Sequence, residues 1–72
     1  MSFNYSKLNG RIVEKYGTQS AFAKKLNVSE RTLSLKLNNR IFFKQNEILS
    51  ICELLGLSGN DIKTYFFTQK VQ

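Results

Sequence analysis

Apolar residues recur along this chain at every third or fourth position, which is the spacing of an amphipathic helix. Strict alternation of apolar and polar residues is hard to find, and the chain contains no proline. The first helix is predicted over residues 5–16, with Asn4 as its cap and Gly17 as a left-handed stop. Gly10 inside this helix is explained if another helix crosses closely there. The apolar stripe of this helix is Tyr5, Leu8, Ile12 and Tyr16.

Two further helices meet at a tight turn in the next stretch of the chain. Thr18 and Ser29 precede them, and a hydroxyl at this position accepts a hydrogen bond from a free helix N–H group. Asn27 lies between the helices and tolerates the positive φ that a tight turn requires. Two short helices joined by such a turn form a helix-turn-helix, the unit that reads DNA. We therefore predict a helix-turn-helix over residues 19–39, made of helices over residues 19–26 and 30–38. The pair Asn39–Arg40 is expected to end the second of these helices, with Asn39 in the left-handed role that glycine often takes.

The remainder of the chain is predicted to support this unit. It comprises an apolar connection at residues 41–43, a fourth helix over residues 45–55 ended by Gly56, and a fifth helix over residues 59–67 capped by Ser58. Residues 68–72 are expected to be frayed or to form a short extended tail. Five helices within 72 residues make one all-α domain over residues 1–72.

Side chains that carry catalytic or metal chemistry are scarce. The chain has no histidine, and its single cysteine, Cys52, lies in an apolar run and is expected to be a small core residue. The five acidic residues stand singly, without paired carboxylates, a phosphate-binding loop or metal-ligand spacing. We therefore expect no catalytic residue, metal site, cofactor or small-molecule substrate. No membrane span or signal peptide is recognisable either, so we expect a cytoplasmic protein.

The net charge of +6 is unevenly distributed along the chain. Residues 15–44 alone carry +6, whereas residues 1–14 carry +1 and residues 45–72 carry −1. This concentration is typical of a surface that approaches phosphates, although a basic face that only keeps a protein dissolved has the same charge. Because the predicted helix-turn-helix lies within the basic segment, we favour double-stranded operator DNA as the partner.

The third helix is the part expected to enter the major groove. At about 100° per residue, Leu33 and Leu37 share the inner face, whereas Arg31 and Leu35 lie on the opposite side. An arginine there can bond guanine O6 and N7 with two parallel hydrogen bonds. Arg31 is therefore the expected base reader, the alternative being an ordinary surface arginine. Ser29 and Thr32, near the helix start, are expected to reach a base edge or a phosphate.

Phosphate contacts are expected from residues that flank the third helix. Gln19 opens the second helix, where its side chain and the local N–H groups can hold a phosphate. Asn38, Asn39 and Arg40 follow the third helix and suit the next stretch of DNA backbone. Lys36 is also expected on this side, mainly as a source of long-range attraction. Such contacts set the register on DNA without reading its sequence.

Leu35 is unusual for an outward-facing position. It is suited to a thymine methyl group in the major groove. It is equally suited to a protein partner, with Arg31 beside it, because exposed apolar groups are common at interaction sites. A single exposed leucine also requires no explanation. The sequence leaves these three interpretations open.

The stretch TQSAFAKKLNVSERTLSLKLNNR resembles the helix-turn-helix of the lambda-repressor-like superfamily. The whole chain is similar to the Cro-like regulators of temperate phages of Gram-positive bacteria, and within them to the modulator-of-repression antirepressor proteins. This similarity also includes YSKLNGRIVEKYGTQ, ICELLGLS and YFFTQKV. The resemblance implies a compact five-helix fold and a part in the phage choice between lysis and lysogeny.

The resemblance also implies roles for individual positions. Base-reading side chains of the family fall at Ser29, Glu30, Arg31 and Leu35, and phosphate-contacting ones at Gln19 and Asn38. Two positions depart from the family pattern. Glu30 replaces a frequent glutamine, and a carboxylate near phosphate is repelled unless it accepts from a cytosine amine. Lys36 replaces an apolar core residue, so Leu37 is expected to take over that packing.

Two functions are consistent with these features. The first is a transcriptional repressor that binds operator DNA through the helix-turn-helix. The second is an antirepressor or co-repressor that mainly binds the cognate phage repressor protein. Specific DNA binding normally requires two half-sites, and a weak homodimer is expected to form through the aromatic tail. That tail comprises Tyr65, Phe66, Phe67 and Val71.

Overall fold

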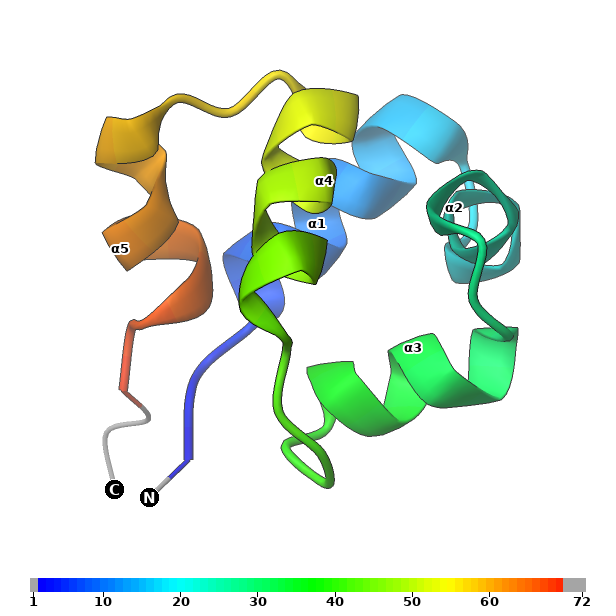
Figure 1. Ribbon diagram of the computed structural model, residues 1–72, viewed down its shortest axis with the longest axis horizontal. Helices are drawn as coiled ribbons and strands as arrows, with labels where there is room; N and C mark the ends of the chain where they lie inside the picture. Colours follow the sequence, from blue (N-terminus) through cyan, green and yellow to red (C-terminus); the bar gives the residue numbers. More distant parts are fainter. Residues whose placement is uncertain (1, 70–72) are drawn as a thin grey trace.

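Five α-helices enclose one core in the computed structural model, which describes residues 2–69 (Figure 1). The compact, all-α, five-helix fold expected from the sequence is confirmed. The two longest helices have 11 residues each, and none of the described helices is long and apolar enough to cross a membrane. The elements are α1 (Ser6–Tyr16), α2 (Gln19–Leu26), α3 (Glu30–Leu37), α4 (Gln45–Leu55), a 3₁₀ turn η1 (Gly59–Asp61) and α5 (Ile62–Phe66).

The predicted helix starts are confirmed by hydrogen bonds. The side chains of Thr18 and Ser29 each accept a bond from the backbone N–H three residues ahead, both at 3.0 Å. Asn4 accepts from the N–H of Ser6 at 2.9 Å, although the residue that directly precedes α1 is Tyr5. These bonds occupy N–H groups that have no partner within the helix.

Left-handed residues end the helices where the sequence places them. Asn27 (φ 64°) forms the turn between α2 and α3, and Asn39 (φ 63°) follows α3. Gly17 and Gly56 do the same after α1 and α4, with φ of 87° and 68°. No close helix crossing explains Gly10, because a Cβ atom built there meets nothing within 4 Å.

The core lies between α1, α2, α4 and α5, and α3 closes it from below in Figure 1. Cys52 is a buried core residue, as expected. On α3 the buried positions are Leu33 and Lys36, whereas Leu37 is only half-buried at the edge. The expectation that Leu37 replaces position 36 in the core is therefore wrong. The other buried residues are Tyr5, Leu8, Ile12, Phe22, Ala23, Ile51, Leu55 and Phe66.

The two ends of the described chain pair with each other. Phe3 and Gln69 form an isolated antiparallel bridge, and the N–H of Asn4 donates to the carbonyl of Thr68 at 2.6 Å. The predicted extended tail is thus confirmed for residues 68–69. The fifth helix is shorter than predicted, because a 3₁₀ turn replaces its first residues. Val71, assigned above to a dimer contact, lies outside the described residues.

Candidate functional site

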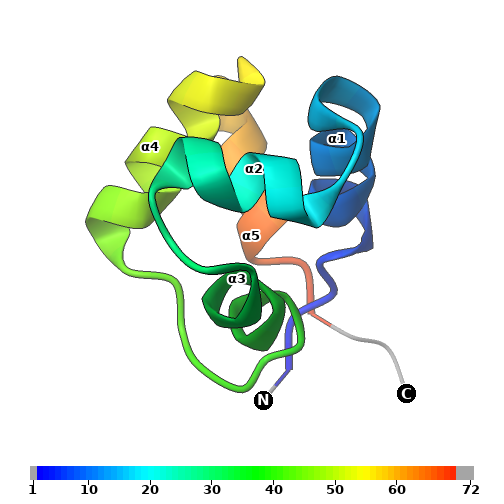
Figure 2. The ribbon, with the colours of Figure 1, turned by 90° about the vertical axis from the view of Figure 1, so that its right-hand side faces the viewer.

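Helices α2 and α3 form the predicted helix-turn-helix. Figure 2 looks almost along α3, with α2 lying across it and the tight turn at one side. Because α3 forms an edge of the molecule in both ribbon views, the side that faces away from α2 is open (Figures 1 and 2). This arrangement is the one in which a recognition helix is presented to a partner.

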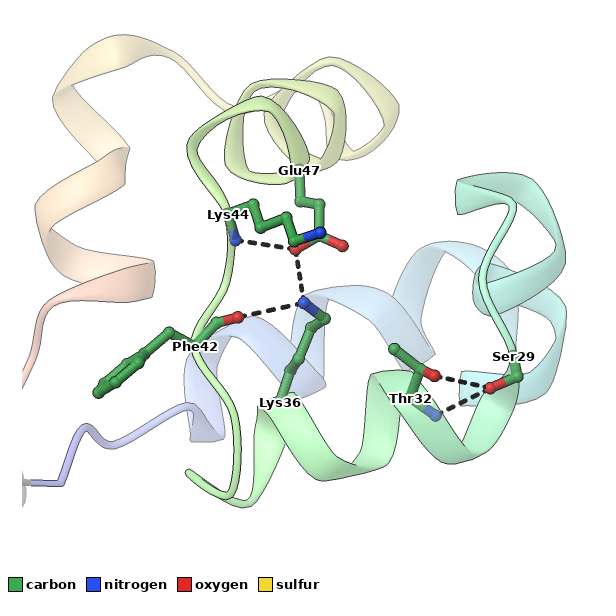
Figure 3. A network of polar contacts seen from close by, with 6 residues as sticks. All are labelled: Ser29, Thr32, Lys36, Phe42, Lys44 and Glu47. Carbon is green, nitrogen blue, oxygen red and sulfur yellow. Dashed lines mark hydrogen bonds and ion pairs between the residues drawn. The ribbon is translucent and has the colours of Figure 1, made fainter.

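The start of α3 presents the predicted base-reading side chains. Glu30 and Arg31 are exposed, and no ion pair within residues 2–69 engages either of them. The hydroxyl of Ser29 accepts the N–H of Thr32 and donates to the hydroxyl of Thr32 at 2.8 Å (Figure 3). The two hydroxyls are therefore held together at the helix start, beside Arg31.

Leu35 is less exposed than the sequence suggests. It is half-buried, so it is not the protruding leucine expected on the outer face of α3. The larger exposed apolar side chains of the described residues lie elsewhere. They are Val13, Ile41, Phe42, Leu49 and Phe67.

The residues predicted to contact phosphate divide into two groups. Gln19 and Asn38 line the same polar hollow of about 220 Å³, between the start of α2 and the end of α3. Gln19 donates to the side-chain oxygen of Asn9 at 2.8 Å, which fixes the orientation of its amide. Asn38 and Arg40 are exposed. The Asn38 amide donates to the carbonyl oxygen of Ser34 at 2.8 Å. The phosphate contacts of these three residues stay predictions.

Asn39 and Lys36 belong to the second group, since both are engaged inside the molecule. The amide of Asn39 is hydrogen-bonded to the backbone of Phe3, which contradicts a primary role at phosphate. Lys36 is only 4% exposed, and its ammonium lies 2.6 Å from Oε1 of Glu47. The prediction of Lys36 on the DNA-facing surface is wrong, because its charge is neutralised within the fold.

Glu47 is the centre of a small polar network (Figure 3). Burial alone would raise the pKa of this carboxyl, but hydrogen bonds from Lys36 and from the N–H of Lys44, with the charges of both lysines, lower it. The carboxylate is thus ionised in the folded protein. It joins the end of α3 to the start of α4.

The comparison with known families is decisive for the chain as a whole. The family described as "Protein of unknown function (DUF739)" matches residues 1–69. The chain belongs to this family. No curated protein matches the chain.

One solved structure connects this DUF739 member to a phage regulator. The solution structure of the modulator of repression (MOR) of the temperate bacteriophage TP901-1 from Lactococcus lactis is similar, with a TM-score of 0.82 and 50% sequence identity. The match covers 100% of this chain and 97% of that chain. The resemblance to Cro-like helix-turn-helix regulators is therefore confirmed. The chain is a homologue of this phage regulatory protein.

Sequence reasoning missed one prominent surface of this DUF739 protein. Phe42 is 81% exposed, and it lines a shallow hollow of about 70 Å³ together with Phe3, Phe43 and Phe67. We call Phe42, Phe67 and the edges of Phe3 and Phe43 the aromatic surface. The sequence shows residues 41–43 only as an apolar connection, so the available signal was three consecutive large apolar residues in a loop.

Proposed function

We propose that this protein modulates repression by binding a phage repressor protein, and so acts as an antirepressor or co-repressor in the choice between lysis and lysogeny. The similarity to the modulator of repression of phage TP901-1 over the whole chain supports this function. The proposed place of action is the cytoplasm of the bacterial host. The observation that carries a protein partner, rather than DNA alone, is the exposure of Phe42.

Phe42 has the properties of an interface anchor. A phenylalanine side chain that is 81% exposed leaves most of its apolar area in water, and burying it against a partner is favourable. Large aromatic side chains are enriched at the centres of protein interfaces, where a few of them carry most of the binding energy. The half-exposed ring of Phe67 extends the aromatic surface.

The charges near Phe42 indicate the chemistry of the partner. Arg40 and Lys44 flank the loop, and both are exposed. The acidic residue of this region, Glu47, is already paired with Lys36. A complementary surface would place an apolar pocket beside carboxylates, because opposite charges across an interface favour association. A second copy of this chain would instead bring like charges together.

A binding titration with the cognate repressor tests the proposal. Phe42→Ala should weaken binding by about 2 kcal/mol or more, roughly 30-fold, as for an interface anchor. Leu49→Ala is the matched control, since Leu49 is 60% exposed on α4 and stands apart from the aromatic surface. Wild-type protein that does not bind the repressor would refute the proposal. Equal effects of the two variants would place the contact elsewhere.

Operator DNA is the second candidate partner, supported by the exposed Arg31 on the open side of α3. Leu35 beside it remains available to a thymine methyl group or to a protein, though with less exposed area than expected. Under this function, Gln19, Asn38 and Arg40 hold phosphates while Ser29, Glu30, Arg31 and Thr32 face bases. This function includes two cases: the protein binds operator DNA alone, or it binds operator DNA only together with the repressor.

Gel-shift titration of operator DNA distinguishes these cases, first with this protein alone and then with the repressor added. Arg31→Ala should cost about 1–3 kcal/mol on operator and relax the preference at one base position. An equal loss on random DNA would make Arg31 a phosphate contact instead. If neither titration shows salt-sensitive binding, the hypothesis that the protein binds operator DNA is refuted.

A further inference from the structure

We propose that the buried Lys36–Glu47 ion pair is a positioning device for Phe42, which holds the backbone of residues 42–44 so that this ring stands in the orientation a partner binds. The use of the ring by a partner rests on the function proposed above. The positioning itself is a property of the isolated protein.

Two hydrogen bonds tie the loop to the ion pair (Figure 3). The ammonium of Lys36 donates to the carbonyl oxygen of Phe42 at 3.1 Å and to Oε1 of Glu47 at 2.6 Å. The same Oε1 accepts the N–H of Lys44 at 2.8 Å. The pair therefore holds the carbonyl that precedes Phe43 and the amide that follows it. The peptide groups on both sides of Phe43 are thus fixed by one ion pair.

The side chains of this segment divide between the interior and the solvent. Phe43 packs edge-on against Tyr5 and Phe66, with ring centroids 5.3 and 5.4 Å away, and the ammonium of Lys36 lies 5.9 Å from its centroid. Phe42 points away from Lys36 in Figure 3 and is 81% exposed. The ring of Phe42 is thus exposed, while the two peptide groups that follow Phe42 are hydrogen-bonded to the ion pair.

An ion pair of this kind contributes more to geometry than to stability. Replacing both members of a buried ion pair by neutral side chains is often close to neutral for folding, because two charges regain their hydration in the unfolded chain. A ring held in advance in its bound orientation raises affinity, since less conformational freedom is lost on binding. We therefore assign to Lys36 and Glu47 the role of positioning residues for partner binding.

The double variant Lys36→Met/Glu47→Gln removes both charges while keeping side chains of similar size. Lys15→Met/Glu53→Gln is the matched control, because both of its positions are exposed. NMR order parameters of the amides of residues 42–44 are measured without a partner. We expect about 0.85 in the wild type and the control, as in rigid backbone, and below about 0.6 in the double variant. If the loop is flexible in the wild type, or equally rigid in the double variant, the ion pair does not position Phe42 and the inference is wrong.

Affinity for the cognate repressor is then measured for the same proteins, each with Phe42 and with Phe42→Ala. The double variant should bind about tenfold more weakly, the cost of ordering one or two residues, and this loss should vanish in the Phe42→Ala background. A loss that persists without the Phe42 ring overturns the inference, because the pair would then act elsewhere. Wild-type protein that fails to bind the repressor refutes the proposed function alone, and the order parameters still decide the positioning.

If the double variant does not fold, Lys36→Met alone takes its place in both measurements. The side chain of Glu47 is partly exposed, so its carboxylate keeps some hydration and can still accept the N–H of Lys44, whereas the hydrogen bond to the carbonyl oxygen of Phe42 is lost. This single variant should therefore loosen the loop to a smaller degree than the double variant. Order parameters equal to those of the wild type would overturn the positioning here as well.

Discussion

Asn39 binds both backbone polar groups of Phe3: its Oδ1 accepts the N–H at 2.8 Å and its Nδ2 donates to the carbonyl at 2.9 Å. The side-chain amide thereby forms with Phe3 the two hydrogen bonds that the backbone of a neighbouring strand would form. Because Phe3 also forms the bridge to Gln69, the turn after α3 is connected to both ends of the described chain. The end of the helix-turn-helix is thus held by residues distant in sequence.

Removing this amide should destabilise the fold. Asn39→Gly keeps the left-handed backbone and loses both hydrogen bonds, so we expect the free energy of unfolding to fall by about 1–3 kcal/mol. Asn39→Ala should lose about 1 kcal/mol more, since an alanine is strained at φ 63°. Urea denaturation measures both. The control is Asn38→Ala at the exposed neighbouring position, expected within about 0.5 kcal/mol of the wild type. An equal effect at the two positions would show that the bonds to Phe3 contribute nothing.

A substitution at Gly10 should instead stabilise the fold. It lies within α1, and a Cβ atom there meets nothing within 4 Å. Gly10→Ala should therefore raise the free energy of unfolding by about 0.5–1 kcal/mol, the difference in helix propensity between the two residues. Gly17→Ala is the control and should be destabilising, because Gly17 has a φ of 87°. Thermal unfolding of both variants gives the comparison, and a lower melting temperature for Gly10→Ala would indicate a contact that the structure lacks.

The polar network at Glu47 predicts a dependence of stability on pH. Burial opposes its ionisation, but Lys36 and the N–H of Lys44 lower its pKa below the ordinary value of 4.5. A carboxyl with a lowered pKa in the folded state stabilises the protein above about pH 4.5, and this contribution is lost as the pH falls through the lowered pKa. Urea denaturation at about pH 6 and about pH 3 should show a larger loss for the wild type than for Glu47→Gln. Glu53→Gln, at an exposed position of the same helix, should behave as the wild type does.

Local signals in the sequence were sufficient for most of the fold. The caps at Thr18 and Ser29 and the left-handed turns at Asn27 and Asn39 were predicted correctly. Each depends on residues within about four positions of itself, so the sequence contains the information directly. The same reasoning could not assign a partner to the amide of Asn39, because Phe3 lies 36 residues away.

The candidate site was harder to predict because its side chains are placed by tertiary contacts. Lysines are seldom buried without a paired charge, and nothing local marks Glu47, 11 residues away, as the partner of Lys36. Likewise, the run of residues 41–43 does not show which ring points outward. In the structure Phe43 is the inward ring, packed against Tyr5 and Phe66, two residues distant in sequence.

Cys52 should be unreactive in the folded protein. The thiol is buried in the core, and burial, followed by the nearby charge of Asp61, raises its pKa. Since the thiolate is the form that attacks disulfide reagents, both effects slow the reaction, and access requires local opening of the structure around α4. We expect an aromatic disulfide reagent at neutral pH to react at least about a hundredfold more slowly with the native protein than with the protein in concentrated urea. Because Cys52 is the only cysteine in the sequence, the absorbance of the released thiol reports this site alone. Rapid reaction of the native protein would mean that α4 opens readily, and it would contradict the burial of this thiol.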